Sequence, residues 1–293
     1  EDFKIEKCKD LANQKWETYI PAKDEVLIGG IVFLNDWEIR SEISNALGKI
    51  FVKNAKSGKE EELIFVNEKV IVQSISQIQK DRNTDLIYLS YSSPKTQTRT
   101  YLYNLKLKKK KLIKEQIIPS GHNPDNYIVE RLECSSHDGR IIPITITRHK
   151  NTNIDGSANL LLYGYGSYGN SMSPGFSSTR LSLINRDIIW VTAHVRGGLE
   201  RGMKWWKEGK LLNKKNTFED YISVAKYLIK KKYTSKGKII GMGGSAGGLL
   251  IGAVVNKSPE LFLGLIMAVP FVDSLTTNLD HSLPLTVGEF DEF

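Results

Sequence analysis

The sequence feature that most constrains the fold is a short glycine-rich turn between two apolar runs. Residues 238–242 (Lys-Ile-Ile-Gly-Met) are typical of a buried strand, and residues 247–255 (Gly-Gly-Leu-Leu-Ile-Gly-Ala-Val-Val) are typical of a helix. Between them, residues 243–247 read Gly-Gly-Ser-Ala-Gly, a G-x-S-x-G pattern centred on Ser245. A strand that turns into a helix within so few residues has room only for small neighbours such as Gly243 and Gly247. The pattern predicts a strand–turn–helix unit of an α/β sheet.

This context gives Ser245 a chemical interpretation. A tight turn of this kind lifts a serine hydroxyl above the sheet and points the N-terminus of the following helix at developing negative charge. We therefore predict that Ser245 is the nucleophile of a serine hydrolase. The structural alternatives are a glycine-rich turn without chemistry and a phosphate-binding loop, although the turn lacks the lysine that a Walker motif requires.

A second feature agrees with this interpretation. Residues 160–163 (Leu-Leu-Leu-Tyr) resemble a strand, and residues 164–169 (Gly-Tyr-Gly-Ser-Tyr-Gly) form a loop after it. In α/β-hydrolases the loop after an early strand contributes part of the oxyanion hole, and the amide after the nucleophile contributes the rest. That amide is here the N–H of Ala246. Without Ser245 downstream, the segment would fit a turn with structural tyrosines equally well.

The first part of the chain, up to about residue 120, has an all-β pattern. Short apolar runs with β-branched and aromatic residues are separated by polar turns, which favours a sandwich or the blades of a propeller. These predicted strands are residues 25–28, 30–34, 49–52, 63–66, 86–89 and 99–103. We place the domain boundary in residues 119–124 (Pro-Ser-Gly-His-Asn-Pro), where turn-forming residues are concentrated.

The second part, residues 121–293, alternates between strand and helix patterns, which predicts a mostly parallel α/β sheet. The clearest helix spans residues 217–231, and Thr217 with Asp220 resembles a capping box at its start. The predicted strands are residues 141–147, 159–163, 188–193, 238–242 and 263–269.

Composition argues against several classes of function. The formal charge is +8, but much of the excess lies in lysine runs that we interpret as solvated faces, and no nucleic-acid-binding motif accompanies them. The longest apolar run, residues 261–271, is shorter than the roughly 20 residues that span a bilayer, and the first residues show no secretory signal. Cys8 and Cys134 fit no metal or redox spacing. We therefore expect a cytoplasmic protein without metal, cofactor, nucleic-acid partner or membrane partner.

Several motifs in the second part resemble the prolyl oligopeptidase family of serine peptidases. They are residues 163–166 (Tyr-Gly-Tyr-Gly), 194–198 (His-Val-Arg-Gly-Gly), 214–218 (Lys-Lys-Asn-Thr-Phe) and 243–248 (Gly-Gly-Ser-Ala-Gly-Gly). Residues 270–273 (Pro-Phe-Val-Asp) and 283–290 (Leu-Pro-Leu-Thr-Val-Gly-Glu-Phe) are similar to the oligopeptidase B branch, also called protease II. The resemblance covers essentially the whole chain. It implies an α/β-hydrolase catalytic domain, here incomplete, preceded by part of an all-β propeller domain.

The resemblance also assigns roles to particular residues. Ser245 would be the nucleophile, and the hydroxyl of Tyr165 would join the Ala246 amide in the oxyanion hole. Glu289 and Asp291 would bind the basic side chain of the substrate, because two carboxylates can hold a guanidinium through charge-assisted hydrogen bonds. The chain departs from the family pattern at Asp291, where the usual residue is the longer glutamate. Other departures are Leu199 in place of a glycine, and Ser173 and Gly175 at positions that are acidic in some members.

The triad acid and base are the part of the site that the sequence does not supply. In this fold the order is Ser, then Asp or Glu, then His, and each follows a later strand. Asp273, Asp280 and His281 satisfy the order, but by resemblance none of them occupies a triad position. We expect the acid and the base to lie beyond Phe293, and about 120 residues to supply only two or three propeller blades.

Two functional hypotheses follow. The first is a serine oligopeptidase that hydrolyses short peptides after Arg or Lys through an acyl-enzyme. The alternative is a catalytically inactive fragment, or one subunit of a split peptidase whose second chain supplies the missing C-terminal strands. An esterase of the same fold is a third possibility, because G-x-S-x-G alone does not distinguish it.

Overall fold

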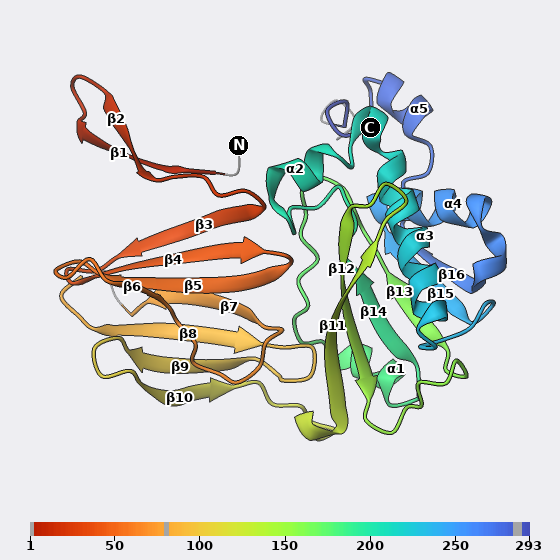
Figure 1. Cartoon of the computed structure of the whole chain (residues 1–293), viewed down its shortest axis with the longest axis horizontal. Coiled ribbons are helices and arrows are strands. Elements are labelled where there is room, and N and C mark those ends of the chain that lie inside the picture. Colours follow the sequence, from red (N-terminus) through yellow and green to blue (C-terminus); the bar gives the residue numbers. More distant parts are fainter. Residues whose placement is uncertain (1–2, 79–81, 284–288) are drawn as a thin grey trace.

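The computed structural model describes residues 3–78, 82–283 and 289–293, and it arranges their strands in an N-terminal all-β part and a C-terminal α/β part (Figure 1). The N-terminal part contains a hairpin and two four-stranded antiparallel sheets, the form expected of propeller blades. The hairpin is β1 (Ile5–Asp10) and β2 (Lys15–Ile20); the first sheet is β3 (Val26–Phe33), β4 (Trp37–Ser44), β5 (Leu47–Asn54) and β6 (Glu60–Glu62); the second is β7 (Val72–Gln77), β8 (Leu86–Ser92), β9 (Arg99–Asn104) and β10 (Lys109–Glu115).

The two four-stranded sheets share one apolar core. Alternate residues of the central strands point into it, so that Ile39, Ile50, Ile87 and Leu89 are fully buried or nearly so. The two runs predicted at residues 25–34 are one strand, β3, with a register shift between Ile28 and Ile31 that spans its two glycines.

The strand predicted at residues 63–66 is wrong. The backbone pairs as β6 just before it, the Leu63 amide still donates to the Ile50 carbonyl of β5 at 2.8 Å, and residues 64–66 leave the sheet. Phe65 there turns into the core and packs edge-on against Tyr91, with ring centroids 5.7 Å apart. The apolar run therefore supplies an aromatic side chain that contacts the second sheet.

The C-terminal part is a six-stranded mixed sheet in the order β11-β12-β14-β13-β15-β16. The neighbours β13–β14, β13–β15 and β15–β16 run parallel, whereas β11–β12 and β12–β14 run antiparallel. The antiparallel β11 was not predicted. The strands are β11 (Tyr127–Ser135), β12 (Ile141–His149), β13 (Leu160–Tyr163), β14 (Ile189–Ala193), β15 (Ile239–Gly244) and β16 (Phe262–Ala268).

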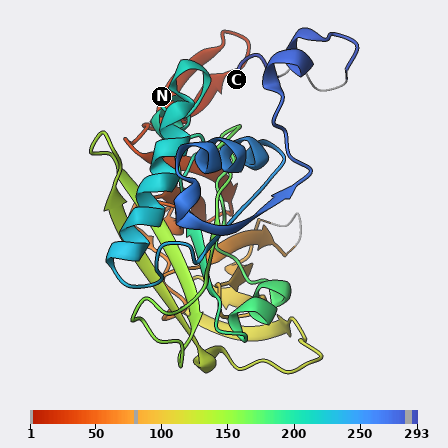
Figure 2. The same cartoon turned by 90° about the vertical axis from the view of Figure 1, so that its right-hand side faces the viewer.

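Helices cover both faces of this sheet. The two long helices α3 and α4 pack on one face, side by side in both views (Figures 1 and 2), and bury Leu228 and Leu250 in the main core. On the other face, Leu181 and Ile184 of α1 form a smaller core next to Trp190. The helices are α1 (Ser178–Ile184), α2 (Gly202–Lys207), α3 (Lys215–Lys230), α4 (Ala246–Lys257) and α5 (Ser274–Leu279), with 3-10 turns η1 (Pro124–Asn126), η2 (Leu211–Asn213) and η3 (Pro259–Leu261).

The predicted capping box at the start of α3 is wrong. The helix begins at Lys215, and its N-cap residue, Lys214, makes no side-chain capping bond. The Thr217 hydroxyl instead donates to the carbonyls of Arg196 and Gly209, at 2.9 and 3.2 Å. Asp220 is fully buried and also bonds Arg196. Both polar residues therefore serve tertiary contacts.

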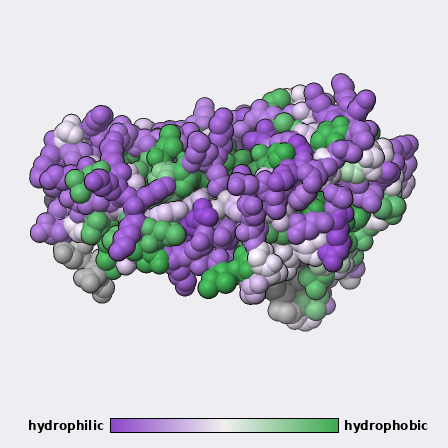
Figure 3. All heavy atoms as spheres, turned by 90° about the horizontal axis from the view of Figure 1, so that it is seen from below, coloured by the Kyte–Doolittle hydropathy of each residue, from purple (hydrophilic) through white to green (hydrophobic). Residues whose placement is uncertain are grey.

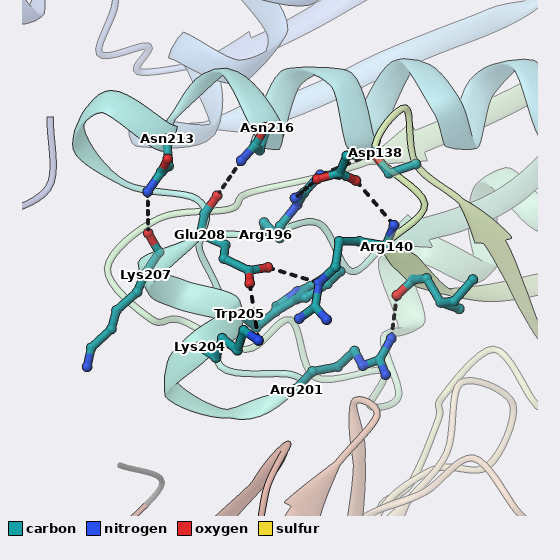
Figure 4. Close-up of polar contacts among 12 residues, drawn as sticks. Asp138, Arg140, Arg196, Arg201, Lys204, Trp205, Lys207, Glu208, Asn213 and Asn216 are labelled. Carbon is teal, nitrogen blue, oxygen red and sulfur yellow. Dashed lines mark hydrogen bonds and ion pairs between the residues drawn. The ribbon is translucent and has the colours of Figure 1, made fainter.

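Arg196 and Asp220 form the buried ion pair that joins α3 to the loop after β14. Asp220 accepts from the Arg196 amide, Nε and Nη2 at 3.0, 2.9 and 2.6 Å, and Arg196 is 1% exposed. Asp138, on the turn between β11 and β12, accepts from Nη1 at 2.5 Å on the other side (Figure 4). Burial alone would lower the pKa of the Arg196 guanidinium, but these bonds outweigh it and raise that pKa. The pair therefore stays ionised.

Trp205 and the arginines around it connect the two parts of the chain. Its ring is fully buried, and the guanidinium groups of Arg140, Arg196 and Arg201 lie 5.5–5.8 Å from its centroid (Figure 4). Arg201 also pairs with Glu25, just before β3, and donates to the Ile141 carbonyl at 2.7 Å. This contact fixes the first blade against the α/β sheet.

The surface is mainly hydrophilic, with separate apolar patches on the face seen in Figure 3. Strand β10, which carries most of one lysine run, is exposed along nearly its whole length. Charged side chains on an edge strand discourage edge-to-edge pairing, which agrees with the interpretation of this run as a solvated face. No helix of the described residues has the length and apolarity to cross a membrane.

We expect Asp220→Asn to destabilise the fold by up to about 3–5 kcal/mol, because the buried Arg196 guanidinium then keeps only one charged partner, the less buried Asp138. Glu219→Gln is the matched control on the same helix. It alters a partly exposed pair with Lys257 and should cost less than about 1 kcal/mol. Urea unfolding followed by circular dichroism measures both, and equal midpoints for the two variants would contradict the prediction.

Candidate active site

Ser245 lies at the tip of the predicted turn, between β15 and α4. Its φ of 52° and ψ of −121° are rare for a residue other than glycine, so the backbone here is strained. The Ser245 amide donates to Ala268 at 2.9 Å, and its carbonyl accepts from Gly248 and Phe271 at 2.8 and 2.9 Å. Neighbouring strand and helix therefore hold the strained conformation.

Steric contacts explain the glycines around the serine. A Cβ atom on Gly243 would lie 2.2 Å from the Gly247 carbonyl oxygen, and a Cβ on Gly247 would lie 3.0 Å from the Gly164 carbonyl oxygen. On Gly248 it would meet Pro270 at 2.5 Å. The turn thus tolerates only small residues, as the sequence indicated.

The side chain of Ser245 does not cap the helix that follows it. Ser245 is exposed, and its hydroxyl makes no capping bond to α4 although it occupies the N-cap position. Ala246, the first residue of α4, is completely buried. Amides of the first helical turn have no partner within the helix, so α4 itself does not use the Ala246 N–H.

The tyrosine loop after β13 lies against this turn. Gly247 packs on Tyr165, since a Cβ on this glycine would lie 3.4 Å from the tyrosine Cα. The Tyr165 hydroxyl interacts with the side chains of Asn170 and Ser245. Burial raises the pKa of this hydroxyl, so it remains protonated and able to donate at neutral pH. The structure thus brings Ser245, Tyr165 and Ala246 together.

The two predicted substrate-binding carboxylates are placed differently. Glu289 is half-buried, and its Oε2 accepts from the Tyr168 hydroxyl at 2.5 Å, so it lies beside the tyrosine loop. Asp291 is exposed. Residues 284–288, which belong to the same family-like motif as Glu289, lie outside the described residues.

Glu292 was missed by the sequence reasoning. It is 3% exposed, and its carboxylate accepts from the Tyr168 amide at 2.8 Å and the Trp206 indole Nε1 at 2.9 Å. The sequence offers only a run of acidic and aromatic residues near 289–293, and nothing in its pattern separates the buried carboxylate from the exposed one.

Lys214 holds the tyrosine loop through two hydrogen bonds. Its ammonium donates to the Gly166 carbonyl at 2.7 Å and to the Ser167 hydroxyl at 2.5 Å, and lies 3.7 Å from Glu292. Burial lowers the pKa of this ammonium to about 8, against the opposing effect of Glu292. The lysine in the family-like motif at residues 214–218 is therefore a support for the loop.

The local candidates for a catalytic acid and base have other surroundings. Asp273 caps α5 by accepting from the Thr276 amide at 3.1 Å, and Asp280 accepts from the Ser282 amide at 2.9 Å. His281 is exposed. His194 is fully buried against Thr145, and burial lowers its pKa, so it is neutral.

The remaining histidines contact residues other than the serine. His122 stacks on Tyr127 and contacts the Lys95 carbonyl, while His137 contacts Ser136. His149 packs edge-on against Tyr127. Within the described part of the chain, no hydrogen bond joins a histidine to Ser245. The expectation that the acid and the base lie beyond Phe293 stays a prediction.

A separate cavity of about 310 Å³ lies where the two parts of the chain meet. Residues of β4, β5 and β7 line it on one side, and residues 171–174, which follow the tyrosine loop, line it on the other. Ser173, one of the departures from the family pattern, is in its wall. None of the predicted site residues lines it, so we do not assign it to the candidate site.

Comparison with known protein families accounts for both parts of the chain. The model of the prolyl oligopeptidase N-terminal β-propeller domain matches residues 4–116, and the model of the prolyl oligopeptidase family matches residues 174–293. The predicted fold class, an incomplete α/β-hydrolase domain preceded by part of a propeller, is confirmed.

Similar proteins are much longer than this chain. Dipeptidyl aminopeptidase BI of Pseudoxanthomonas mexicana is 38% identical over 96% of this chain and 39% of its own length. Protease 2 of Moraxella lacunata is 39% identical over 93% of this chain and 37% of its own length. The chain therefore spans about 40% of the length of these relatives.

Solved structures show the same relationship. Oligopeptidase B of Trypanosoma brucei, in a closed form with covalently bound antipain, superposes with a TM-score of 0.86 at 34% identity, over 94% of this chain and 40% of that one. Oligopeptidase B of Leishmania major gives 0.85 at 31% identity, over the same shares. With both of its parts matched by models of one family, and its fold shared with these structures, the chain belongs to the prolyl oligopeptidase family.

Proposed function

We propose that this chain carries the nucleophile and oxyanion hole of a serine oligopeptidase that hydrolyses short peptides after Arg or Lys. The observation that carries the proposal is the strained, exposed Ser245, whose side chain interacts with the Tyr165 hydroxyl at the N-terminus of α4. The covalent antipain complex of the trypanosomal relative supports it, because it shows that a protein of this fold binds an inhibitor covalently.

The chemistry follows from this geometry. The Ser245 Oγ attacks the carbonyl carbon of the scissile bond, and its proton passes to a base. The carbonyl oxygen becomes an oxyanion that accepts from the Tyr165 hydroxyl and the Ala246 amide. Collapse of this intermediate expels the amine, which takes the proton from the base. Water then releases the acyl group and restores the Ser245 hydroxyl.

The preference for basic residues rests on the acidic residues near the end of the chain. Glu289 lies next to the tyrosine loop and can accept hydrogen bonds from a guanidinium or an ammonium group. Asp291 is exposed and shorter than the usual glutamate, so in this proposal it contributes less than Glu289. The substrates are thus short basic peptides, and a cytoplasmic location suits two free thiols.

A second candidate function is favoured by the surroundings of Ser245. The serine is exposed, and in the part of the chain that the structure describes no histidine bonds it. The alternative is therefore an inactive remnant, or one subunit of a split peptidase in which a second chain supplies the base and the acid.

Covalent labelling distinguishes these functions. A fluorophosphonate probe should label the wild-type chain at Ser245 when a base is present, and Ser245→Ala should abolish the labelling. Ser182→Ala, an exposed hydroxyl on α1, is the control and should label like the wild type. The chain is tested alone and mixed with the part of Protease 2 that follows the matched region. Labelling only in the mixture supports a split enzyme, and labelling in Ser245→Ala refutes the nucleophile assignment.

Tyr165→Phe should slow acylation on the order of 10²-fold with little change in ground-state binding, because it removes one oxyanion donor. Tyr163→Phe is the matched control. Tyr163 lies two residues before Tyr165 in the chain, and its ring stacks on Trp190. Single-turnover kinetics with an arginyl fluorogenic peptide measure both variants. A loss of less than about threefold for Tyr165→Phe would exclude its hydroxyl from the oxyanion hole.

Glu289→Gln should weaken binding of an arginyl ligand by about 10- to 100-fold and leave binding of the neutral citrulline analogue nearly unchanged. The reason is that a neutral amide cannot replace the charge-assisted hydrogen bonds of the carboxylate. Glu260→Gln, an exposed carboxylate on η3, is the control. Calorimetric titration gives both affinities, and an unchanged arginine-to-citrulline ratio would contradict the basic specificity.

A further inference from the structure

Tyr168 is held between two carboxylates from one short segment of the chain. Its backbone amide donates to Glu292 Oε1 at 2.8 Å, and its hydroxyl donates to Glu289 Oε2 at 2.5 Å. Its φ of 58° lies in the left-handed region, which side chains other than glycine seldom adopt. The bond from the amide to Glu292 therefore stabilises a backbone conformation that would otherwise be unfavourable.

Glu292 is itself fixed on three sides. Its second oxygen, Oε2, accepts from the Trp206 indole at 2.9 Å, and the Lys214 ammonium lies 3.7 Å from Oε1. Its carbonyl accepts from the Leu211 amide at 2.9 Å. With 3% exposure, this carboxylate does not face solvent. The Glu292 carboxylate therefore holds the tyrosine loop in place. A carboxylate that binds substrate would need an accessible oxygen.

Phe293 completes the attachment of the segment to the site. Its ring lies edge-on to Tyr168 with centroids 5.7 Å apart, and 5.3 Å from the ring of Phe271. Phe271 in turn donates its amide to the Ser245 carbonyl at 2.9 Å. The segment that carries Glu289 is thus in contact with both the tyrosine loop and the neighbours of the strained serine.

The Tyr168 hydroxyl leaves part of the Glu289 carboxylate available. It occupies Oε2, and among the described residues no hydrogen bond involves Oε1. A carboxylate with one oxygen fixed by a donor has fewer orientations to lose when it binds a cation through the other oxygen.

We propose that Tyr168 and Glu292 are positioning residues for the recognition of basic side chains: Tyr168 orients Glu289, and Glu292 holds Tyr168. The inference rests on the proposed function, because it takes Glu289 as the recognising carboxylate. It adds a division of labour within the acidic segment, in which the half-buried carboxylate of Glu289 binds the cation and the buried carboxylate of Glu292 anchors the loop.

The experiment compares two ligands of the same shape, benzoyl-arginine amide and benzoyl-citrulline amide, by calorimetric titration of the full chain. In the wild type the arginine ligand should bind more tightly. Tyr168→Phe removes only the hydroxyl, and Glu292→Gln keeps the volume but replaces one acceptor. Each should lower the arginine-to-citrulline affinity ratio on the order of threefold to tenfold. Tyr163→Phe and Glu260→Gln are the matched controls and should keep the wild-type ratio.

Hydrogen exchange separates the two positioning roles. Glu292→Gln should accelerate exchange of the Tyr168 amide, because it weakens the acceptor of that amide. The acceptor is the Glu292 carboxylate, which the Trp206 indole and Lys214 also contact. Tyr168→Phe should change this exchange little, since its amide bond to Glu292 is kept. Thermal unfolding of each variant shows whether it is folded at the titration temperature.

The outcomes distinguish this inference from the proposed function. If Glu289→Gln removes the arginine preference while Tyr168→Phe and Glu292→Gln keep it, the positioning roles are refuted and the basic specificity stands. Equal weakening of both ligands in the two variants would also refute positioning, because it indicates general damage to the site. If the wild type has no arginine preference, or Glu289→Gln retains it, the basic specificity itself fails and the inference fails with it.

Discussion

The buried pair of Arg196 and Asp220 is the interaction on which the arrangement of the site depends. It attaches α3 to the loop after β14, and the carbonyl of Arg196 then accepts from Thr217. The next residue, Gly197, lies so close to Gly166 that a Cβ would be 1.9 Å from its carbonyl oxygen. The tyrosine loop therefore rests on a segment that the ion pair holds. A pair this deep in the protein is costly to break, because the Arg196 guanidinium would keep only the less buried Asp138 as a charged partner.

Two kinds of strain meet in the candidate site, and each is held by different contacts. Ser245 has its positive φ imposed by the turn between a parallel strand and a helix, where backbone hydrogen bonds to Ala268 and Phe271 hold it. Tyr168 has its positive φ supported by a side chain, the buried carboxylate of Glu292. The first set of contacts comes from β16 and the residues after it, whereas the second joins residues 124 positions apart. Tyr165, the proposed oxyanion donor, neighbours both: its hydroxyl interacts with the Ser245 side chain, and its ring centroid lies 6.2 Å from that of Tyr168.

This difference also explains what the sequence could predict. The strand–turn–helix unit around Ser245 and the loop with Tyr165 carry local signals, namely glycine spacing and an apolar run, and the structure places both residues as expected. The run at residues 63–66 and the pattern of Thr217 with Asp220 were misread, because long-range packing decided their roles. Glu292 could not be found at all, because its burial depends on Trp206 and Tyr168, and an acidic run gives no sign of which carboxylate faces inward.

Strand β16 has a consequence for the behaviour of the chain in solution. Among the described residues it pairs only with β15, and Leu263, Ile266 and Val269, on it or just after it, are 43–85% exposed. Parallel strands are ordinarily covered on both faces, but this edge strand exposes apolar side chains. Its outer edge also has backbone hydrogen-bonding groups without a strand partner among the described residues. Such an edge favours pairing with another strand. A strand that paired with this edge would therefore cover its open hydrogen-bonding groups and its exposed apolar side chains together.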